Sequence, residues 1–195
     1  MKIDQTEKYI NWNQPEVVFG TVPCTWHQVD VPWVEVIQTK EVDIKDPWKI
    51  YTTDLKYQLE DLHSSWNIPP ESVTHYMSIR PELEHGLEQC LDHFKDFKYS
   101  YNLLKITSGH MVVWHFDTYA TFVKEIGIEQ KDSDKIKRTV IALTPWSFGH
   151  VIQIGGDVLS GWKMGDTFSW SGDTWHGACN FGKDDLIIMQ VTYID

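Results

Sequence analysis

Short apolar runs separated by glycine, aspartate and asparagine dominate the second half of the chain, from Tyr101 onward. Runs of this length, bounded by turn-forming residues, are typical of strands in an antiparallel β-sandwich or barrel. The pattern predicts a mainly β fold, with strands at residues 101–106, 111–116, 139–143, 150–154, 167–170, 175–179 and 186–193.

The first hundred residues predict a different mixture of elements. Residues 17–44 are rich in valine, tryptophan and threonine and are punctuated by prolines, which fits short, edge-like strands. Apolar residues then recur with helical spacing from Leu55 to Trp66 and again from Pro81 to Phe94. We expect these two helices to flank and support the β-rich half.

A polar stretch from Lys124 to Lys137 interrupts the β pattern and contains Gly127. We interpret it as a loop. Loops of this length inside a compact β domain are more often functional than not, and the usual role is that of a covering lid.

Composition and charge narrow the class of protein. The 195 residues show no composition break, so we expect one domain over residues 1–195, with strands and supporting helices in 1–100 and a β core in 101–195. The net charge of -11 argues against nucleic acid and anionic membranes as partners. A charged N-terminus and three widely spaced cysteines, interpreted as reduced thiols, favour a cytoplasmic location.

The sequence His115-Phe-Asp117 ends one of the predicted strands. With a period of two, the imidazole and the carboxylate project from one face and can converge on one ion. The motif alone is weak evidence, because 9 histidines and 28 acidic residues in 195 positions predict about 1.3 chance occurrences of His-x-Asp/Glu. The alternative is a histidine at a strand end beside an aspartate cap.

A third candidate ligand, His176, follows Asp117 by 59 residues, after a strand and a tight turn. Two ligands close together and a third far along the chain is the arrangement of a facial triad of two histidines and one carboxylate on a β-barrel. From spacing alone, a buried core histidine with satisfied hydrogen bonds explains His176 equally well.

Four segments between residues 138 and 182 resemble the Fe(II)/2-oxoglutarate-dependent oxygenase superfamily: Arg138-Thr-Val-Ile-Ala-Leu-Thr-Pro-Trp, Gly149-His-Val-Ile-Gln-Ile-Gly-Gly, Trp162-Lys-Met-Gly-Asp and Trp175-His-Gly-Ala-Cys-Asn-Phe-Gly182. The likeness is closest to the aspartyl/asparaginyl β-hydroxylase and prolyl hydroxylase branches and to similar small phage proteins, and it covers residues 101–193. It implies a double-stranded β-helix (a cupin-like jelly roll) in which residues 101–195 form the catalytic core. It also implies that His115, Asp117 and His176 bind Fe(II).

The same resemblance implies a reaction in which 2-oxoglutarate and dioxygen are consumed while a C–H bond of the substrate is hydroxylated. Related halogenases replace the carboxylate ligand with a small residue, so the intact Asp117 favours hydroxylation. The substrate, an amino-acid side chain in a peptide or a small molecule, is left open. Two alternatives also stay open: a cupin-type metal enzyme that does not use 2-oxoglutarate, and a non-catalytic binding module.

The family pattern is broken where a basic residue is expected to bind the distal carboxylate of 2-oxoglutarate. In the aspartyl hydroxylase branch this is an arginine ten positions after the last histidine, but here that position is Leu186. Arg138 is the first substitute, because a guanidinium suits a bidentate carboxylate and because it shares a strand face with two small residues. Lys183 and Lys105 are the alternatives.

Three further polar residues lie near the motifs without a clear assignment. Asn180 shares strand parity with His176 and could support the metal site, but an asparagine before a Phe-Gly step is equally well explained as a turn former. His150 could face the pocket or cap the sheet, and His110 is expected to be structural. Most of the tryptophans that flank the motifs, Trp170 among them, are expected to pack in the core.

Overall fold

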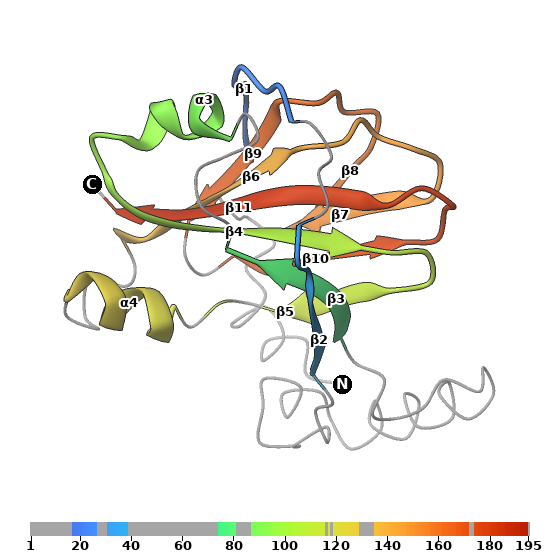
Figure 1. Ribbon diagram of the computed structural model, residues 1–195, viewed down its shortest axis with the longest axis horizontal. Helices are drawn as coiled ribbons and strands as arrows, with labels where there is room; N and C mark the ends of the chain where they lie inside the picture. The colour runs from blue at the N-terminus through green and yellow to red at the C-terminus, as the bar shows by residue number, and fades with distance from the viewer. Residues whose placement is uncertain are drawn as a thin grey trace, which may run out of the picture.

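The computed structural model describes residues 17–26, 31–38, 74–80, 87–115, 117, 119–128, 135–171 and 174–194. Within these ranges the chain is mainly β, with short helices beside the sheets (Figure 1). The strands are β1 (Val18–Thr21), β2 (Val34–Gln38), β3 (Thr74–Ile79), β4 (Lys98–Ile106), β5 (Met111–His115), β6 (Lys137–Ala142), β7 (His150–Ile154), β8 (Asp157–Leu159), β9 (Asp166–Ser171), β10 (His176–Asn180) and β11 (Leu186–Ile194).

The strands form two antiparallel sheets whose order defines a jelly roll. One sheet has the order β1-β9-β6-β11-β4-β3-β2 and the other the order β5-β10-β7-β8. From β4 onward the chain passes back and forth between the sheets, so that β4, β6, β9 and β11 belong to the larger and β5, β7, β8 and β10 to the smaller. This is the double-stranded β-helix that the resemblance implied, with β1, β2 and β3 added at the edges of the larger sheet.

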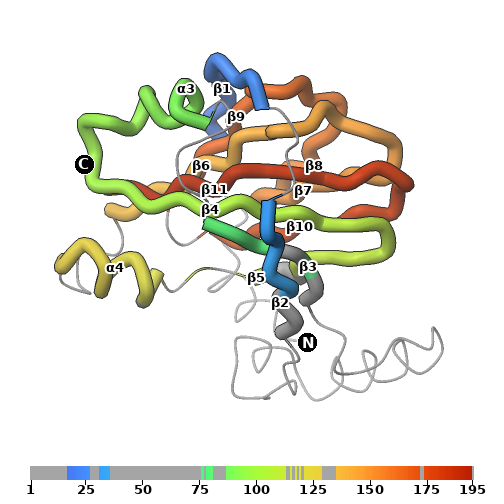
Figure 2. Tube along the Cα trace, viewed as in Figure 1, coloured from blue at the N-terminus to red at the C-terminus, as the bar shows by residue number. Residues whose placement is uncertain are grey.

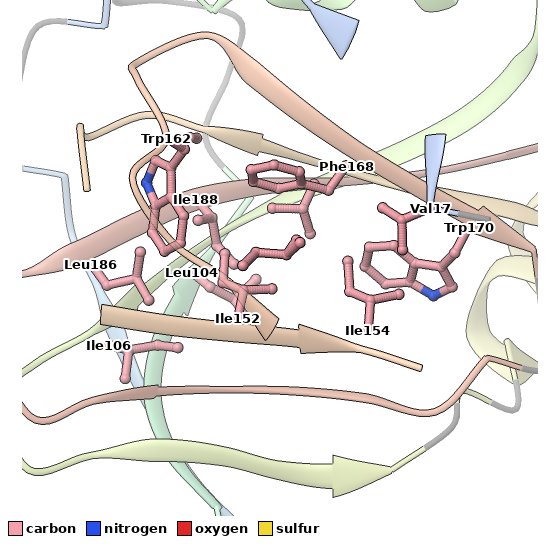
Figure 3. Close-up of a cluster of buried hydrophobic side chains, with 13 residues drawn as sticks. Val17, Leu104, Ile106, Ile152, Ile154, Trp162, Phe168, Trp170, Leu186 and Ile188 are labelled. Atoms are coloured by element: carbon pink, nitrogen blue, oxygen red, sulfur yellow. The ribbon is translucent and has the colours of Figure 1, made fainter. Parts of the chain in front are cut away.

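The interior between the sheets is apolar because inward-facing residues alternate along each strand (Figure 3). Leu104, Val140 and Ile188 come from the larger sheet, while Ile152 and Ile154 come from the smaller. Leu186 lies in this cluster and is fully buried. The position where the aspartyl hydroxylase branch has a basic residue is therefore part of the hydrocarbon core.

The opposite face of the larger sheet is also buried, which explains why its strands lack a clean polar alternation. Leu103, Ile141 and Met189 project from that face into a second apolar cluster. The helix α3 (Glu88–Leu91) and the 3-10 turn Asp92–Phe94 cover this cluster, together with the segment that follows β1. β1, although far from β9 in sequence, pairs with it along the sheet edge (Figure 2).

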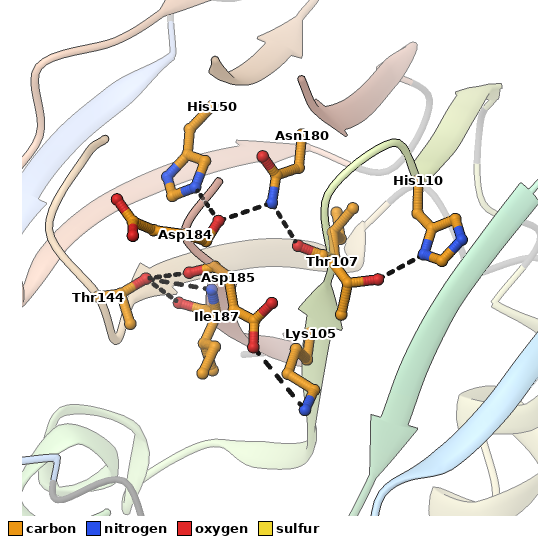
Figure 4. A network of polar contacts seen from close by, with 10 residues as sticks. Lys105, Thr107, His110, Thr144, His150, Asn180, Asp184, Asp185 and Ile187 are labelled. Atoms are coloured by element: carbon orange, nitrogen blue, oxygen red, sulfur yellow. Dashed lines mark hydrogen bonds and ion pairs between the residues drawn. The ribbon is translucent and has the colours of Figure 1, made fainter. Parts of the chain in front are cut away.

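Asn180 fastens the turns at one end of the barrel (Figure 4). Its side-chain amide donates to the carbonyls of Ile106 and Asp184, both at 2.8 Å, and its side-chain oxygen accepts from the Gly182 amide at 2.9 Å. The backbone of Gly149 packs so closely on Gly182 that a Cβ on Gly149 would lie 2.2 Å from the Gly182 nitrogen. Asn180 is thus a turn former, which is one of the two interpretations that the sequence left open for it.

The structure confirms the predicted strands of residues 101–193 and adds β8. The loop prediction from Lys124 to Lys137 is wrong at both ends, because α4 (Ala120–Ile126) extends through Ile126 and β6 begins at Lys137. Phe122 and Val123 pack from α4 into a small cluster with Ile136 and Ile194, and this burial outweighs the polar composition. Gly127, in the left-handed region at φ 67°, ends the helix.

The predicted helices and the early strands have mixed outcomes. β1 and β2 confirm short strands in residues 17–44, whereas the helix predicted from Leu55 to Trp66 lies outside the described residues. The helix predicted from Pro81 to Phe94 is observed as α3 and the 3-10 turn after it, its first residues also lying outside the described ranges. In the part of the chain that is described, no helix has the length and apolar character needed to cross a bilayer.

Candidate metal centre

His115 and His176 face each other across two neighbouring strands. β5 ends at His115, β10 begins at His176, and the two residues are paired in register. Their ring centroids lie 4.4 Å apart. Asp117 lies two residues beyond the end of β5. The end of β5 thus provides His115 and Asp117, and the neighbouring strand β10 provides His176.

The three side chains converge at distances that suit one ion. Asp117 Oδ1 lies 3.7 Å from His115 Nε2, and Asp117 Oδ2 lies 3.3 Å from His176 Nε2. One ligand atom from each residue can be chosen so that all lie within 4.8 Å of one another. Ligands about 2.1 Å from a divalent metal are separated from each other by about 3.0 to 3.4 Å in octahedral or tetrahedral geometry. The side chains therefore need only small adjustments to bind an ion.

His176 has the tautomer that a metal ligand requires. Its Nδ1 lies 2.9 Å from the carbonyl oxygen of Thr174, which can only accept, so Nδ1 carries the proton and Nε2 presents a lone pair. Burial lowers the pKa of His176, against the opposing attraction of Asp117, and so favours the neutral imidazole. A lone pair and a carboxylate oxygen 3.3 Å apart repel each other unless a cation lies between them.

Buried polar atoms without hydrogen bonds gather at this point of the structure. Among the described residues they include Asp117 Oδ2, His176 Nε2, Arg138 Nε and Trp170 Nε1. Buried polar atoms without hydrogen bonds are rare in folded proteins, since each costs about 1 to 3 kcal/mol, and a cluster of them is typical of a site that binds an ion or a ligand. The donor set of two imidazoles and one carboxylate fits a divalent transition metal with open coordination positions.

Arg138 projects into the site from β6, on the inward face it shares with Val140 and Ala142, as predicted. Its Nη1 lies 3.2 Å from Asp117 Oδ2 and donates to Gln190 Oε1 at 3.0 Å. Burial opposes ionisation of Asp117, but the Arg138 guanidinium and the neighbouring imidazoles outweigh it, and the pKa of Asp117 lies far below its usual range. Asp117 is therefore a carboxylate at every physiological pH.

Tyr119 supports Arg138 from an unusual backbone conformation. Its φ of 52° makes it the one non-glycine residue of the described chain in the left-handed region. The Arg138 guanidinium carbon lies 5.3 Å from the centre of the Tyr119 ring, within cation–π range. A strained residue two positions after a metal-ligand candidate, in contact with the adjacent cation, is typical of a functional site.

Trp170 and Tyr76 add to the wall of the site. The Trp170 ring lies 4.8 Å from the His176 ring, centroid to centroid, and Trp170 is paired in register with Arg138 across β9 and β6. Figure 3 shows Trp170 at the end of the interior cluster, beside Ile154. Burial raises the pKa of Tyr76, whose hydroxyl also senses the charges of Arg138 and Asp117. The site is thus built from both sheets.

Sequence reasoning missed Tyr76, Tyr119 and Gln190. Gln190 carried a readable signal, because it is a polar residue on the strand face otherwise occupied by Leu186 and Ile188. For Tyr119, the only signal in the sequence was its closeness to Asp117. For Tyr76 there was no signal in the sequence, because β3 reaches the site only by pairing with β4 along the sheet.

The structure does not bring the alternative lysines to the triad. Lys183 is exposed in the turn after β10, beyond the end of the strand opposite to His176. Lys105 lies on the outer face of the larger sheet, with its ammonium 5.2 Å from the Trp33 ring and 3.9 Å from Asp185.

The remaining histidines of the motifs, His150 and His110, form hydrogen bonds to groups in the turns. His150 is buried and accepts from the Ser147 amide at Nδ1, while its Nε2–H donates to the Asp184 carbonyl at 2.8 Å. His110 contacts the Thr107 hydroxyl through Nδ1. Both contacts are part of the network in Figure 4, which explains these histidines without a role in metal binding.

Comparisons with known proteins give no family assignment for this chain. No protein-family model and no curated protein matches it. Similar solved structures include a Pseudomonas putida prolyl-4-hydroxylase, at 10% identity and a TM-score of 0.46 over 84% of this chain and 92% of that one. They also include a predicted oxalate decarboxylase from Thermotoga maritima, at 15% identity and a TM-score of 0.40 over 62% and 82%. A Schizosaccharomyces pombe Cnp3 cupin domain is similar at 10% identity and a TM-score of 0.37, over 62% and 61%. At these identities no activity passes to this chain.

Proposed function

We propose that the protein is an Fe(II)- and 2-oxoglutarate-dependent dioxygenase that hydroxylates a C–H bond of an amino-acid side chain, in a peptide or a small molecule. The observation that carries the proposal is the convergence of His115, Asp117 and His176 at the mouth of a jelly roll, with unsatisfied ligand atoms directed at one point. Two neutral nitrogen donors and one carboxylate are the ligand set of non-haem Fe(II) oxygenases, and they leave positions open for co-substrate and dioxygen.

When bound, Fe(II) with 2-oxoglutarate and dioxygen supplies the oxidising power for hydroxylation, with succinate and carbon dioxide as the other products. The residues of the chain hold and orient the reactants. Thr174 fixes the His176 ring by accepting from its Nδ1–H, and Arg138 holds Asp117 through Oδ2 while His115 approaches Oδ1. Trp170 and Tyr119 exclude water from the inner side of the site, since both are buried.

Arg138 is proposed to bind the distal carboxylate of 2-oxoglutarate. The co-substrate brings two carboxylates into a protein of net charge -11, and the second carboxylate needs a cation within the barrel. Leu186 supplies none, and both alternative lysines lie elsewhere. Arg138 contacts Asp117 and Gln190 through Nη1 and has an unsatisfied Nε, so that a guanidinium edge remains for a carboxylate.

The proposal is tested by succinate release from 2-oxoglutarate in the presence of Fe(II) and ascorbate, because such enzymes turn over slowly without their prime substrate. We expect succinate in proportion to bound Fe(II), none without metal, and none from the His176→Ala variant. A protein that binds Fe(II) at the triad and yet neither binds nor oxidises 2-oxoglutarate would contradict the proposal.

One observation favours a second candidate, a cupin-type metal enzyme that does not use 2-oxoglutarate. The guanidinium that would receive the co-substrate is already engaged by Asp117 and Gln190. If Arg138 only holds the metal-binding carboxylate, 2-oxoglutarate should fail to bind the metal-loaded protein. Calorimetric titration of 2-oxoglutarate into the anaerobic Fe(II) protein distinguishes the two candidates.

A further inference from the structure

Two of the three cysteines meet on the outer face of the larger sheet, away from the metal centre. Cys24 lies three residues after β1, in the segment beside α3 (Figure 1), and Cys90 belongs to α3 itself. Their thiols are hydrogen-bonded to each other. Cys90 also donates to the carbonyl of Pro23, the neighbour of Cys24, at 3.5 Å. Residues 66 positions apart are thus held thiol against thiol.

The two thiols differ in access. Cys90 is completely buried in the outer apolar cluster, while Cys24 is partly exposed at its edge. A reagent in solution can therefore reach Cys24, and Cys24 alone of the pair.

The segment that carries Cys24 is fixed against the sheet. The Val22 amide donates to the Gly165 carbonyl at 2.9 Å. Gly165 has a φ of +89°, and a Cβ there would lie 2.5 Å from the Val22 carbonyl oxygen, so the two backbones meet at the closest approach that glycine permits. Trp26, buried further along the segment, donates its backbone amide to the Cys24 sulfur. Cys24 is held at Cys90 by both flanks of its segment.

The contacts give the two thiols different acidities. The hydrogen bond with Cys90, opposed by burial and assisted by the Trp26 amide, lowers the pKa of Cys24 to about 7. The same hydrogen bond and burial raise the pKa of Cys90 well above its ordinary value. Cys179 has no such partner among the causes of its shift, and burial alone raises its pKa. The exposed member of the pair is thus the nucleophile, since the thiolate is the reactive form.

We propose that Cys24 and Cys90 are a redox-active dithiol, in which Cys24 attacks a low-molecular-weight disulfide such as oxidised glutathione and Cys90 resolves the product into an internal disulfide. The Cys24 thiolate attacks one sulfur of the reagent, whose S–S bond breaks, and the released thiolate takes up a proton. Once Cys24 is part of the mixed disulfide, it no longer carries a negative charge. The effect by which that charge kept Cys90 protonated is then lost. Cys90 then loses its proton and attacks Cys24 Sγ, and the second reagent thiol leaves with that proton.

The overall exchange is balanced. Two protein thiols lose two electrons and two protons and form one S–S bond, while the disulfide of the reagent is reduced to two thiols. The resulting bond joins the segment after β1 to α3 on the outer face of the larger sheet. It requires nothing from the metal site, so this proposal stands or falls independently of the proposed function.

The test uses the full-length protein in buffers of reduced and oxidised glutathione, followed by acid quenching and intact mass analysis. The wild type should lose two hydrogens in mass, and digestion without reductant should yield a peptide pair joined through Cys24 and Cys90. The Cys90→Ala variant should stop at one glutathionyl group on Cys24. The Cys24→Ser variant should form neither product, and Cys179→Ser, the matched control, should behave as the wild type.

Three outcomes would overturn the proposal. They are glutathionylation of Cys179 in preference to Cys24, a wild type that stops at the mixed disulfide, and an internal bond that involves Cys179. Because the decisive measurement is peptide mapping of the wild type, the proposal stays testable if a cysteine variant fails to fold, which circular dichroism would reveal.

Discussion

The guanidinium of Arg138 lies 3.2 Å from the Asp117 carboxylate oxygen that also approaches His176. Arg138 lies on β6 of the larger sheet, and Asp117 lies in the segment that follows β5 of the smaller sheet. One carboxylate is therefore shared between a fixed cation and the place where a metal would bind. An arginine at this distance stabilises the carboxylate and also limits how much negative charge the site offers to the metal.

Removing one ligand should abolish metal binding and spare the fold. The His176→Ala variant is expected to bind Fe(II) more than a hundredfold more weakly, because changes to residues that merely support a ligand already cost about 10- to 100-fold. Calorimetric titration under anaerobic conditions measures the affinity. His93→Ala is the matched control, since His93 is exposed and lies outside the site. Equal metal affinity in the two variants would remove His176 from the ligand set.

Arg138 should govern the affinity for 2-oxoglutarate. Loss of a buried, charge-assisted clamp costs about 2 to 5 kcal/mol, so Arg138→Ala should bind the co-substrate roughly thirtyfold to several thousandfold more weakly in the metal-loaded, anaerobic protein. Lys183→Ala removes an exposed positive charge outside the site and should leave the affinity unchanged. The opposite pattern, a large loss only in the Lys183 variant, would show that the clamp is Lys183.

Asn180 should contribute to stability and not to metal binding. Its side chain is completely buried and makes three hydrogen bonds to backbone groups of the turns. Asn180→Asp keeps the shape but replaces the amide donor with an acceptor facing two carbonyls, which should lower the free energy of unfolding by about 2 to 5 kcal/mol. Urea unfolding of the metal-free protein measures this. Metal affinity of the folded variant should equal that of the wild type.

Alkylation of Cys24 should follow its lowered pKa. The thiolate is the reactive form, so the rate should be small below and full above a midpoint at about pH 7. Cys90→Ala removes the hydrogen bond that stabilises the thiolate, and the midpoint should move up towards the ordinary value of 9.0. Iodoacetamide kinetics read by peptide mass measure both midpoints, with Cys179 as the internal reference. A midpoint that stays in place in the variant would assign the lowered pKa to another cause.

Strand parity predicted that His115 and Asp117 project to one side and that Arg138 shares a strand face with Val140 and Ala142, because a two-residue period specifies which side chains share a face. Parity also separates Leu186 from Lys105 on the two faces of the sheet. The conformation of Tyr119 and the role of Tyr76 could not be predicted in this way. The first depends on a left-handed residue at the start of α4, and the second on an edge strand that joins the sheet from a distant part of the chain.

The error at α4 has a similar cause. Polar residues dominate the stretch that follows Lys124, and the burial of Phe122 and Val123 against Ile194 is visible only once β11 lies beside the helix. Asn180 illustrates the reverse case. Its turn-forming role was among the interpretations of the sequence, but only the paired carbonyls of Ile106 and Asp184 show why an asparagine is required there.

The site draws His115 and His176 from the smaller sheet and Arg138 and Trp170 from the larger. Hydrocarbon side chains of the interior pack beside both groups: Ile154 is paired with His176 along the smaller sheet and shares the interior cluster with Trp170. The volume of the apolar side chains in the interior thus helps to set the distance between the two halves of the polar site. A change in side-chain volume there alters the separation between the imidazoles and the guanidinium, so the grip on a metal or a carboxylate can be tuned without exchanging any group that touches either.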